Sequence, residues 1–383
     1  MFRFATARQI VFGAGALNQL GALAQGLGQR AYVVLGASGR LRERLQELLG
    51  AAGVALQVGQ VSAEPTVQDV LVLVRAARAA GSEWVLGVGG GSVIDAAKAL
   101  AALLANPGDP LDFLEVVGRG RALRAPSLPF IAVPTTAGTG AEVTKNAVLA
   151  ASEQRVKVSL RSDFMLPTVA LVDPDLTLAM PPALTASTGL DALTQCLEPF
   201  VSCQSNPITD ALSRQGLERA RGALRRAFHD GADRAARSDM ALVSLFGGLS
   251  LANAKLGAVH GFAGPIGGRF PAPHGAVCAR LLPLVVQRNI LALRARAPEH
   301  PSLTRYADVA QILTGRASAD ALDAVAWLHD LVDELAIPPL GEYGLTASAV
   351  PELVARAQAS SSMQGNPIAL TPEELTQTLE AAL

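Results

Sequence analysis

The chain has 383 residues, of which 50% are hydrophobic, and its 33 acidic and 32 basic residues leave a formal net charge of −1. A chain of this length and apolar content forms two or three domain-sized units with large cores. The balanced charge and the lack of a long basic run argue against proteins that bind nucleic acid or anionic membranes, so we expect neither partner.

Neither the N-terminal sequence nor the cysteine spacing indicates a secreted protein. The first residues, MFRFATARQIVFG, contain no apolar signal core. The apolar stretch 96–105 is too short to span a bilayer. The three cysteines, Cys196, Cys203 and Cys278, follow no disulfide or metal-knuckle spacing. We therefore predict a cytoplasmic protein without a transmembrane segment, and we assign no metal to the cysteines.

In the first half of the chain, short apolar runs alternate with helical patterns. The apolar runs lie at 31–36, 55–61 and 84–88, and helical patterns occupy 39–53 and 67–80. Strands that alternate with helices in this way form parallel sheets covered by helices. We predict an α/β unit.

Two loops rich in small residues follow apolar runs of this unit. Gly89-Gly90-Gly91-Ser92 leads directly into a helix, and glycines there let backbone N–H groups and a helix N-terminus approach a phosphate. The sequence GVGGGS is not the GxGxxG fingerprint, so a simple tight turn remains the alternative. After the run 129–134, the hydroxyls of Thr135, Thr136 and Thr139 suit ribose and phosphate oxygens.

The second half contains a candidate metal site. His260 follows a predicted helical run at 242–259, and a Gly/Pro-rich stretch, predicted as a loop, leads to His274 at the start of another helix. Asp191 lies among apolar residues of an earlier helix, where an unpaired carboxylate would be costly to bury. One carboxylate and two imidazoles suit Zn(II), Fe(II) or Mn(II) and leave a position open for a ligand. Gln195, one turn after Asp191, could add an amide oxygen.

Taken in order, these segments resemble the iron-containing, or group III, alcohol dehydrogenases, which are related in fold to glycerol dehydrogenase and dehydroquinate synthase. The resemblance runs through GGGSVIDAAKA, PTTAGTGAEVT, KVSLRSDFMLPTVALVDPDLTLAMPP, GLDALTQCLEPF and GAVHGFAGPIGGRFPAPHGA. It implies an α/β N-terminal dinucleotide-binding domain at 1–180 and an all-α C-terminal domain for metal and substrate at 181–383. The prolines of Met180-Pro181-Pro182 mark this boundary.

The resemblance also implies functional residues. Asp191, His260 and His274 match the family's catalytic metal ligands, with Gln195 as the fourth candidate. The positions implied to contact or surround the nicotinamide cofactor are Gly36, Ser38, Gly89, Gly90, Gly91, Ser92, Asp95, Thr135, Thr136, Thr139, Lys157 and Leu178. The alternative for Lys157 is a solvent-exposed lysine that contacts no cofactor.

Three positions depart from the family pattern. Gln195 replaces a usual histidine ligand, so we expect looser binding of Fe or Zn because an amide oxygen is a weaker donor than imidazole. Gly264 replaces a further histidine near the substrate, which leaves water or a cofactor ribose hydroxyl as the proton path. Gly36 replaces an Asp that binds the ribose 2′-hydroxyl in NAD-using members. Its loss permits NADP, with Ser38 or Arg40 near the 2′-phosphate, and favours NADP or dual use.

We therefore expect a metal-dependent, NAD(P)-linked alcohol dehydrogenase that moves a hydride between nicotinamide and a small alcohol or carbonyl compound. The resemblance also implies a homo-oligomer. Alternatives are a maleylacetate reductase, a dehydroquinate synthase-like lyase and a nucleotide-binding homologue without activity. Asp191 argues against the first because such members usually lack this ligand, and the absence of a basic cluster near the histidines argues against the second.

Overall fold

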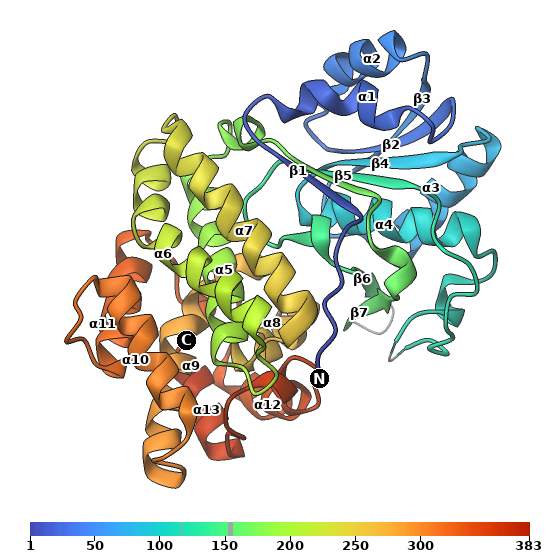
Figure 1. Cartoon of the computed structure of the whole chain (residues 1–383). Coiled ribbons are helices and arrows are strands. Elements are labelled where there is room, and N and C mark those ends of the chain that lie inside the picture. The colour runs from blue at the N-terminus through green and yellow to red at the C-terminus, as the bar shows by residue number, and fades with distance from the viewer. Residues whose placement is uncertain (116, 152–155) are drawn as a thin grey trace. The chain divides into compact units, whose positions relative to one another are not determined.

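The computed structural model describes residues 1–115, 117–151 and 156–383. The chain forms two compact units (Figure 1). Residues 5–136 and 140–177 form one, here called the sheet unit, and residues 1–4, 137–139 and 178–383 form the other, here called the helical unit.

The sheet unit is built on six parallel strands, counted over the described residues. These are β1 (Gln9–Phe12), β2 (Arg30–Gly36), β3 (Ala55–Val61), β4 (Trp84–Gly89), β5 (Phe130–Pro134) and β8 (Val169–Val172). Their order across the sheet is β1-β8-β5-β4-β2-β3, and every pair of neighbours is parallel. The predicted strands at 31–36, 55–61 and 84–88 are all present.

Helices cover both faces of this sheet, as Figure 1 shows. They are α1 (Leu20–Ala24), α2 (Arg42–Ala51), α3 (Val67–Ala79) and α4 (Gly91–Ala105). Along β2, Val33 and Leu35 pack in a core with α1 and α2, whereas Tyr32 and Val34 pack with α3 and α4. Since successive side chains of a strand point to opposite faces, a strand that is apolar throughout fits only between two helical layers.

A small antiparallel pair, β6 (Asn146–Ala151) and β7 (Val156–Arg161), completes this unit. The buried Lys98 of α4 holds the segment that leads into β6. Its ammonium donates to the Ala141 carbonyl, the Thr144 hydroxyl and the Asn146 carbonyl at 2.7–2.9 Å. The 3-10 turns of the unit are η1 (Ala16–Gln19), η2 (Pro110–Asp112), η3 (Ala141–Val143), η4 (Asp163–Met165) and η5 (Pro174–Thr177).

The strand order reverses beside β2. The chain places β3 on one side of β2 and then returns to place β4 on the other. In open α/β sheets, such a reversal leaves a crevice beyond the carboxyl ends of the two strands, and ligands bind there. These ends are Gly36 in β2 and Gly89 in β4.

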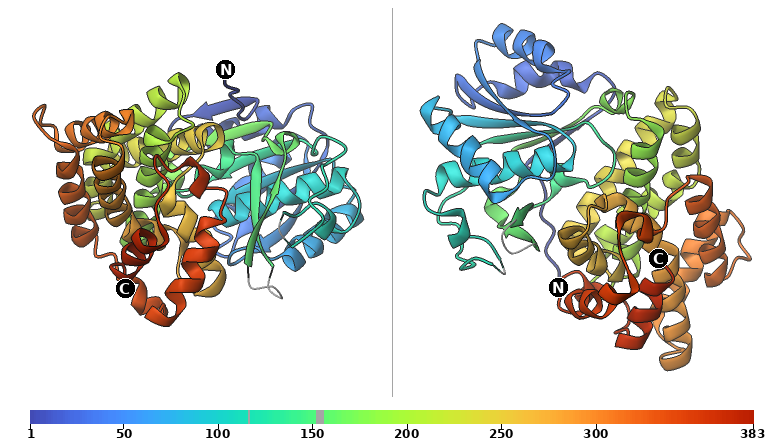
Figure 2. Two further views of the ribbon diagram at one scale, coloured as in Figure 1. Left: turned by 90° about the horizontal axis from the view of Figure 1, so that it is seen from below. Right: turned by 180° about the vertical axis from the view of Figure 1, so that it is seen from behind.

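The helical unit contains no strand among its described residues, and Figure 2 shows it from two further sides. Its long helices are α5 (Pro182–Val201), α6 (Pro207–His229), α7 (Arg234–Ala254), α8 (Ala258–Arg269), α9 (His274–Arg296), α10 (Pro301–Thr314), α11 (Ala321–Glu334), α12 (Val350–Gln358) and α13 (Pro372–Glu380). Short turns are η6 (Leu340–Tyr343), η7 (Ala347–Ala349) and η8 (Met363–Gly365). A parallel α/β sheet and an all-α unit confirm the predicted fold class.

Helix α9 is long and apolar enough to cross a membrane by length and composition alone. However, 72% of its apolar stretch is buried inside the protein. Val277, Leu281 and Ile290 are completely buried in the core of the helical unit. Packing in the core therefore accounts for the hydrophobicity of this helix.

The segment around His260 differs from the prediction. The helical run predicted at 242–259 is broken, because α7 ends at Ala254, Lys255 adopts a left-handed φ of 56° and α8 begins at an angle of 98° to α7. The stretch predicted as a loop after His260 continues as α8 up to Arg269. One of its glycines allows close packing, since a Cβ on Gly261 would lie 2.9 Å from Met363 Cε.

Candidate metal centre and nucleotide pocket

Three predicted metal ligands meet inside the helical unit. Asp191 lies in the middle of α5, His260 in the first turn of α8, and His274 is the first residue of α9. The Asp191 Oδ1 atom lies 3.2 Å from His260 Nε2 and 3.9 Å from His274 Nε2. Asp191 and His260 are buried, whereas the His274 side chain keeps 34% of its surface exposed. Of these three side chains, that of His274 is therefore the one with substantial exposure.

A fourth donor in this cluster was not predicted. Cys278 Sγ lies 3.7 Å from the Nε2 atoms of both His260 and His274. The possible ligand atoms of all four residues lie within 4.8 Å of one another. All three cysteines are free thiols, and none of them was predicted to bind a metal. The signal was the spacing: Cys278 follows His274 by four residues, which places both on one face of α9.

Glu198 orients the imidazole of His260. Its Oε2 lies 2.7 Å from His260 Nδ1, on the opposite side of the ring from Asp191. A carboxylate that accepts the Nδ1–H favours the tautomer in which Nε2 has a lone pair for a metal, which is the usual arrangement around metal-bound histidines. Glu198 follows Asp191 by seven residues, two turns along the same face of α5. Glu198 was not among the residues predicted from the sequence.

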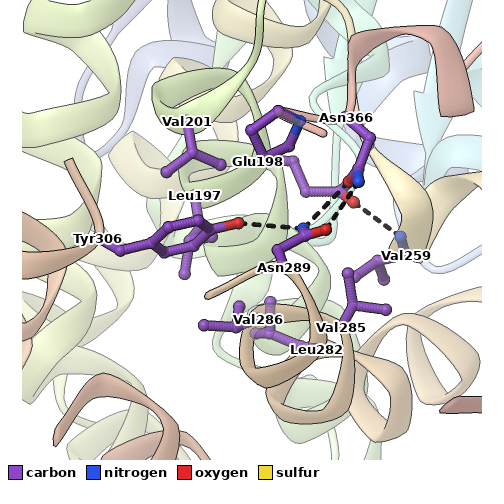
Figure 3. A pocket seen from close by; sticks show the side chains of 12 residues that line it. Leu197, Glu198, Val201, Val259, Leu282, Val285, Val286, Asn289, Tyr306 and Asn366 are labelled. Carbon is purple, nitrogen blue, oxygen red and sulfur yellow. Dashed lines mark hydrogen bonds between the residues drawn. The ribbon is translucent and has the colours of Figure 1, made fainter. Parts of the chain in front are cut away.

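Side chains from distant segments also hold the first turn of α8. The N–H groups of Ala258 and Val259 donate to Asn366 Oδ1 at 3.1 Å and to Glu198 Oε1 at 2.8 Å. Figure 3 shows the Glu198 contact beside a buried network in which Asn366 and Asn289 exchange hydrogen bonds and Asn289 donates to the Tyr306 hydroxyl. These acceptors satisfy N–H groups that a helix start leaves unpaired. Glu198 thus positions both the helix and the imidazole that it carries.

The charges of the cluster shift its pKa values. Burial by itself would raise the pKa of Asp191, but His260 and His274 hold it below its ordinary value. Burial would lower the pKa of His260, yet Cys278, Asp191 and Glu198 together raise it well above the ordinary range. Cys278 and Asp191 also raise the pKa of His274. The pocket therefore favours positive charge, which protons and a divalent cation can both supply.

The donor set fits a divalent metal ion. It combines carboxylate oxygen, imidazole nitrogen and thiol sulfur, which are the ligand types of zinc and ferrous sites. Gln195 hydrogen-bonds Asp191 through its side chain, while its buried Oε1 has no hydrogen-bond partner among the described residues. An unpaired buried carbonyl oxygen is costly, and a cation or its water would satisfy it.

A second site lies at the strand reversal of the sheet unit. A pocket there is lined by the ends of β2 and β4 and by residues that follow β2, β4 and β5, namely Leu35, Gly36, Ser38, Gly39, Arg40, Leu41, Val88, Gly89, Gly90 and Thr135. Five predicted cofactor contacts, Gly36, Ser38, Gly89, Gly90 and Thr135, are therefore brought together. Arg40 donates to the Leu176 carbonyl.

The glycine turn leaves little room for side chains. A Cβ on Gly89 would lie 2.5 Å from Val93 Cγ2, and one on Gly90 would lie 3.4 Å from Thr136 Cγ2. Gly90 is the N-cap of α4, and Gly91 and Ser92 form its first turn. Bare backbone at the N-terminus of a 15-residue helix offers N–H groups and a favourable dipole to a phosphate. The cradle fits a dinucleotide pyrophosphate.

Other predicted cofactor residues lie outside this pocket lining. Asp95 accepts a hydrogen bond from the Val148 N–H at 3.0 Å. Lys157 forms an ion pair of 2.6 Å with Glu64. Thr139 and Leu178 belong to the helical unit. For these residues a cofactor contact stays a prediction.

Comparison with known proteins identifies both units. Residues 7–174 match the family model of the iron-containing alcohol dehydrogenases, and residues 185–383 match the model of the C-terminal region of the Fe-containing alcohol dehydrogenase family. The chain belongs to the iron-containing alcohol dehydrogenase family. The predicted family and the predicted activity, a metal-dependent NAD(P)-linked alcohol dehydrogenase, are thereby confirmed.

Relatives within the family cover nearly the whole chain. Alcohol dehydrogenase 4 of Saccharomyces cerevisiae is 34% identical over 91% of this chain and 87% of its own length. The NADPH-dependent butanol dehydrogenase of Clostridium saccharobutylicum is 32% identical over 99% of this chain and 97% of its own. The crystal structure of a 1,3-propanediol oxidoreductase superposes with a TM-score of 0.92 at 31% identity and covers all of both chains.

Proposed function

We propose that this dehydrogenase reduces small aldehydes, and oxidises the corresponding alcohols, with NADPH or with both nicotinamide cofactors. One divalent ion, Fe or Zn, would be held by Asp191, His260 and His274. The convergence of these three side chains from three helices carries the proposal. Residues 1–180 would bind the dinucleotide and residues 181–383 the metal and the substrate.

The chemistry divides between the bound groups and the protein. A divalent cation polarises a carbonyl oxygen and lowers the pKa of an alcohol, and nicotinamide exchanges the hydride. Asp191 supplies the negative charge that holds the cation, and Glu198 keeps His260 Nε2 directed at the cluster. Gln195 donates to Asp191 and leaves its carbonyl oxygen close to the donor set.

The proton path would run through water or a cofactor ribose hydroxyl. Gly264 follows His260 by one turn of α8, and a Cβ there would meet no described atom within 4 Å. The position therefore has space for water where many family members carry an imidazole.

Cofactor choice would depend on Gly36. A Cβ at this position would meet Val93 Cγ2 at 3.8 Å, which is ordinary van der Waals contact, so nothing in the fold prevents a larger residue. With no carboxylate at the end of β2, a 2′-phosphate meets no repulsion, and Ser38 lines the same pocket. Arg40 is engaged with the Leu176 carbonyl and would need to release it to reach a phosphate.

Two relatives support a small substrate. The names of the butanol dehydrogenase and the 1,3-propanediol oxidoreductase refer to butanol and to 1,3-propanediol, and the former is described as NADPH-dependent. We extend both features to this chain. We also propose that the chain assembles into a homo-oligomer and lies in the cytoplasm.

A single substitution tests the cofactor assignment. Steady-state kinetics with NADPH and NADH against butanal and 3-hydroxypropanal would be compared for the wild type and Gly36→Asp. We expect the ratio of kcat/KM for NADPH to that for NADH to fall at least about tenfold in the variant, or ~1.4 kcal/mol, because a carboxylate repels the 2′-phosphate. Ser38→Asp offers a second introduced carboxylate in the same pocket. An unchanged ratio in both variants would contradict this reading of the pocket.

A further inference from the structure

Cys278 stands out because the proposed metal set does not use it. Its side chain is completely buried, and its sulfur faces two imidazole nitrogens at 3.7 Å. A cysteine that served only to fill the core would need no polar neighbours. Because His274 and Cys278 are separated by four residues of α9, one helix face presents an imidazole and a thiol to the same point.

Four of the six distances between the donor atoms are close to those of a four-coordinate site. With bonds of about 2.0–2.1 Å to nitrogen and oxygen and about 2.3 Å to sulfur, neighbouring donors of a tetrahedral ion lie about 3.3–3.6 Å apart. Here the sulfur lies 3.7 Å from each imidazole nitrogen, and Asp191 Oδ1 lies 3.2 Å from one and 3.9 Å from the other. Small movements of the side chains would bring all four donors onto one ion.

Gln195 is less suited to the fourth position. Its side chain is already hydrogen-bonded to Asp191, so its amide orients the carboxylate. A neutral amide oxygen is also a weaker donor to zinc than a thiolate. The thiolate, in contrast, supplies a second negative charge beside Asp191 and would bring a divalent ion to neutrality.

We infer that Cys278 is the fourth metal ligand of this protein. It takes the role of the histidine that Gln195 replaces. The inference rests on the proposed function, because it requires that Asp191, His260 and His274 hold a metal. A set of one thiolate, two imidazoles and one carboxylate favours zinc over ferrous iron, since sulfur is the softer donor. Substrate would then approach the ion at a fifth position.

Cobalt reports this ligand independently of activity. The metal-free full-length protein would be titrated with Co²⁺ and followed by absorption, because thiolate ligands give an intense near-ultraviolet charge-transfer band that oxygen and nitrogen ligands lack. We expect one Co²⁺ per chain with this band in the wild type. In Cys278→Ser, which preserves the volume of the side chain, and in Cys278→Ala, we expect one Co²⁺ without the band and bound at least about tenfold more weakly.

Two variants serve as matched controls. Cys203→Ala removes an exposed thiol away from the cluster, and Gln195→Ala removes the competing amide; we expect both to keep the band. Stoichiometric Co²⁺ without the band in the wild type, or a band that persists in both Cys278 variants, would overturn the Cys278 assignment alone. A wild type that binds no Co²⁺ would overturn the metal site and this ligand with it.

Discussion

At the scale of single residues, the proposed metal site depends on how Glu198 orients His260. The carboxylate accepts from the imidazole at 2.7 Å and from the Val259 N–H at 2.8 Å. Glu198→Gln keeps an oxygen for the N–H but loses the second acceptor. We expect the affinity for Zn²⁺, measured by competition with a chelator, to fall about 10- to 100-fold, because this is the usual loss when a residue that orients a metal ligand is replaced.

The control for this substitution is Glu373→Gln, which makes the same chemical change on an exposed residue of α13. Circular dichroism would show that both variants fold. Zn²⁺ affinities equal to the wild type in Glu198→Gln would mean that the imidazole is oriented without its carboxylate partner.

Residues of the site were predictable from the sequence where their residue type is unusual for its position. Asp191, His260 and His274 were visible because a buried carboxylate and two histidines near helix ends are unusual. Glu198 and Cys278 were missed because a Glu inside a helix and a Cys in an apolar run have ordinary explanations, and only the packing of α5, α8 and α9 gives them partners. For Gly36 and Ser38, the strand reversal supplied the pocket that the sequence only implied.

At the scale of elements, two buried ionisable groups lie where α4 is joined to the turn that precedes β6, through hydrogen bonds from Lys98 to Ala141 and Thr144. Lys98 and Glu142 are both buried, burial lowers the pKa of Lys98, and burial raises the pKa of Glu142 to about 7. Because the folded pKa of Glu142 exceeds its unfolded value, its contribution to stability is complete below about pH 4 and is lost as the pH rises through about 7.

We therefore expect Glu142→Gln to be more stable than the wild type above pH 8. A shift from 4.5 to about 7 corresponds to a gain of up to about 3 kcal/mol in the free energy of unfolding. Near pH 4 the two proteins should be equally stable. Urea unfolding at both pH values measures this difference, and a variant that is less stable than the wild type at pH 8 would show that the ionised pair stabilises the fold.

Elements were predictable where local pattern determines them. Strands β2, β3 and β4 and helices α2 and α3 follow from apolar runs and helix formers, and they lie within a few residues of their predicted bounds. No bounds were predicted for the strands β1 and β8. Helix α8 was predicted as a loop because its glycines and Pro265 favour turns. Its first N–H groups are satisfied by Glu198 and Asn366, which are distant in sequence, so local reasoning had no access to this stabilisation.

At the scale of the whole molecule, the order of the motifs carried more information than any one of them. A GGGS turn, a Thr/Gly loop or a single histidine each has a simple structural explanation. Their succession along 383 residues identified the family, and the match of both family models agrees with it. Metal identity, cofactor preference and substrate depend on a few positions, and Gln195, Gly264 and Gly36 are those at which we predict a departure from the common family pattern.

The central claim is that the Asp191, His260 and His274 cluster holds a metal on which turnover depends. Elemental analysis of the purified protein, paired with NADPH oxidation against butanal before and after chelation, tests it most directly. Asp191→Asn removes the only carboxylate of the cluster, and Asp333→Asn makes the same change at an exposed position of α11. We expect about one Zn or Fe per chain in the wild type and Asp333→Asn, activity that is lost on chelation and restored by metal, and neither metal nor turnover in Asp191→Asn. A wild-type protein without metal that binds NADPH but shows no turnover after Zn²⁺ or Fe²⁺ is added would contradict the account and indicate a nucleotide-binding homologue without activity.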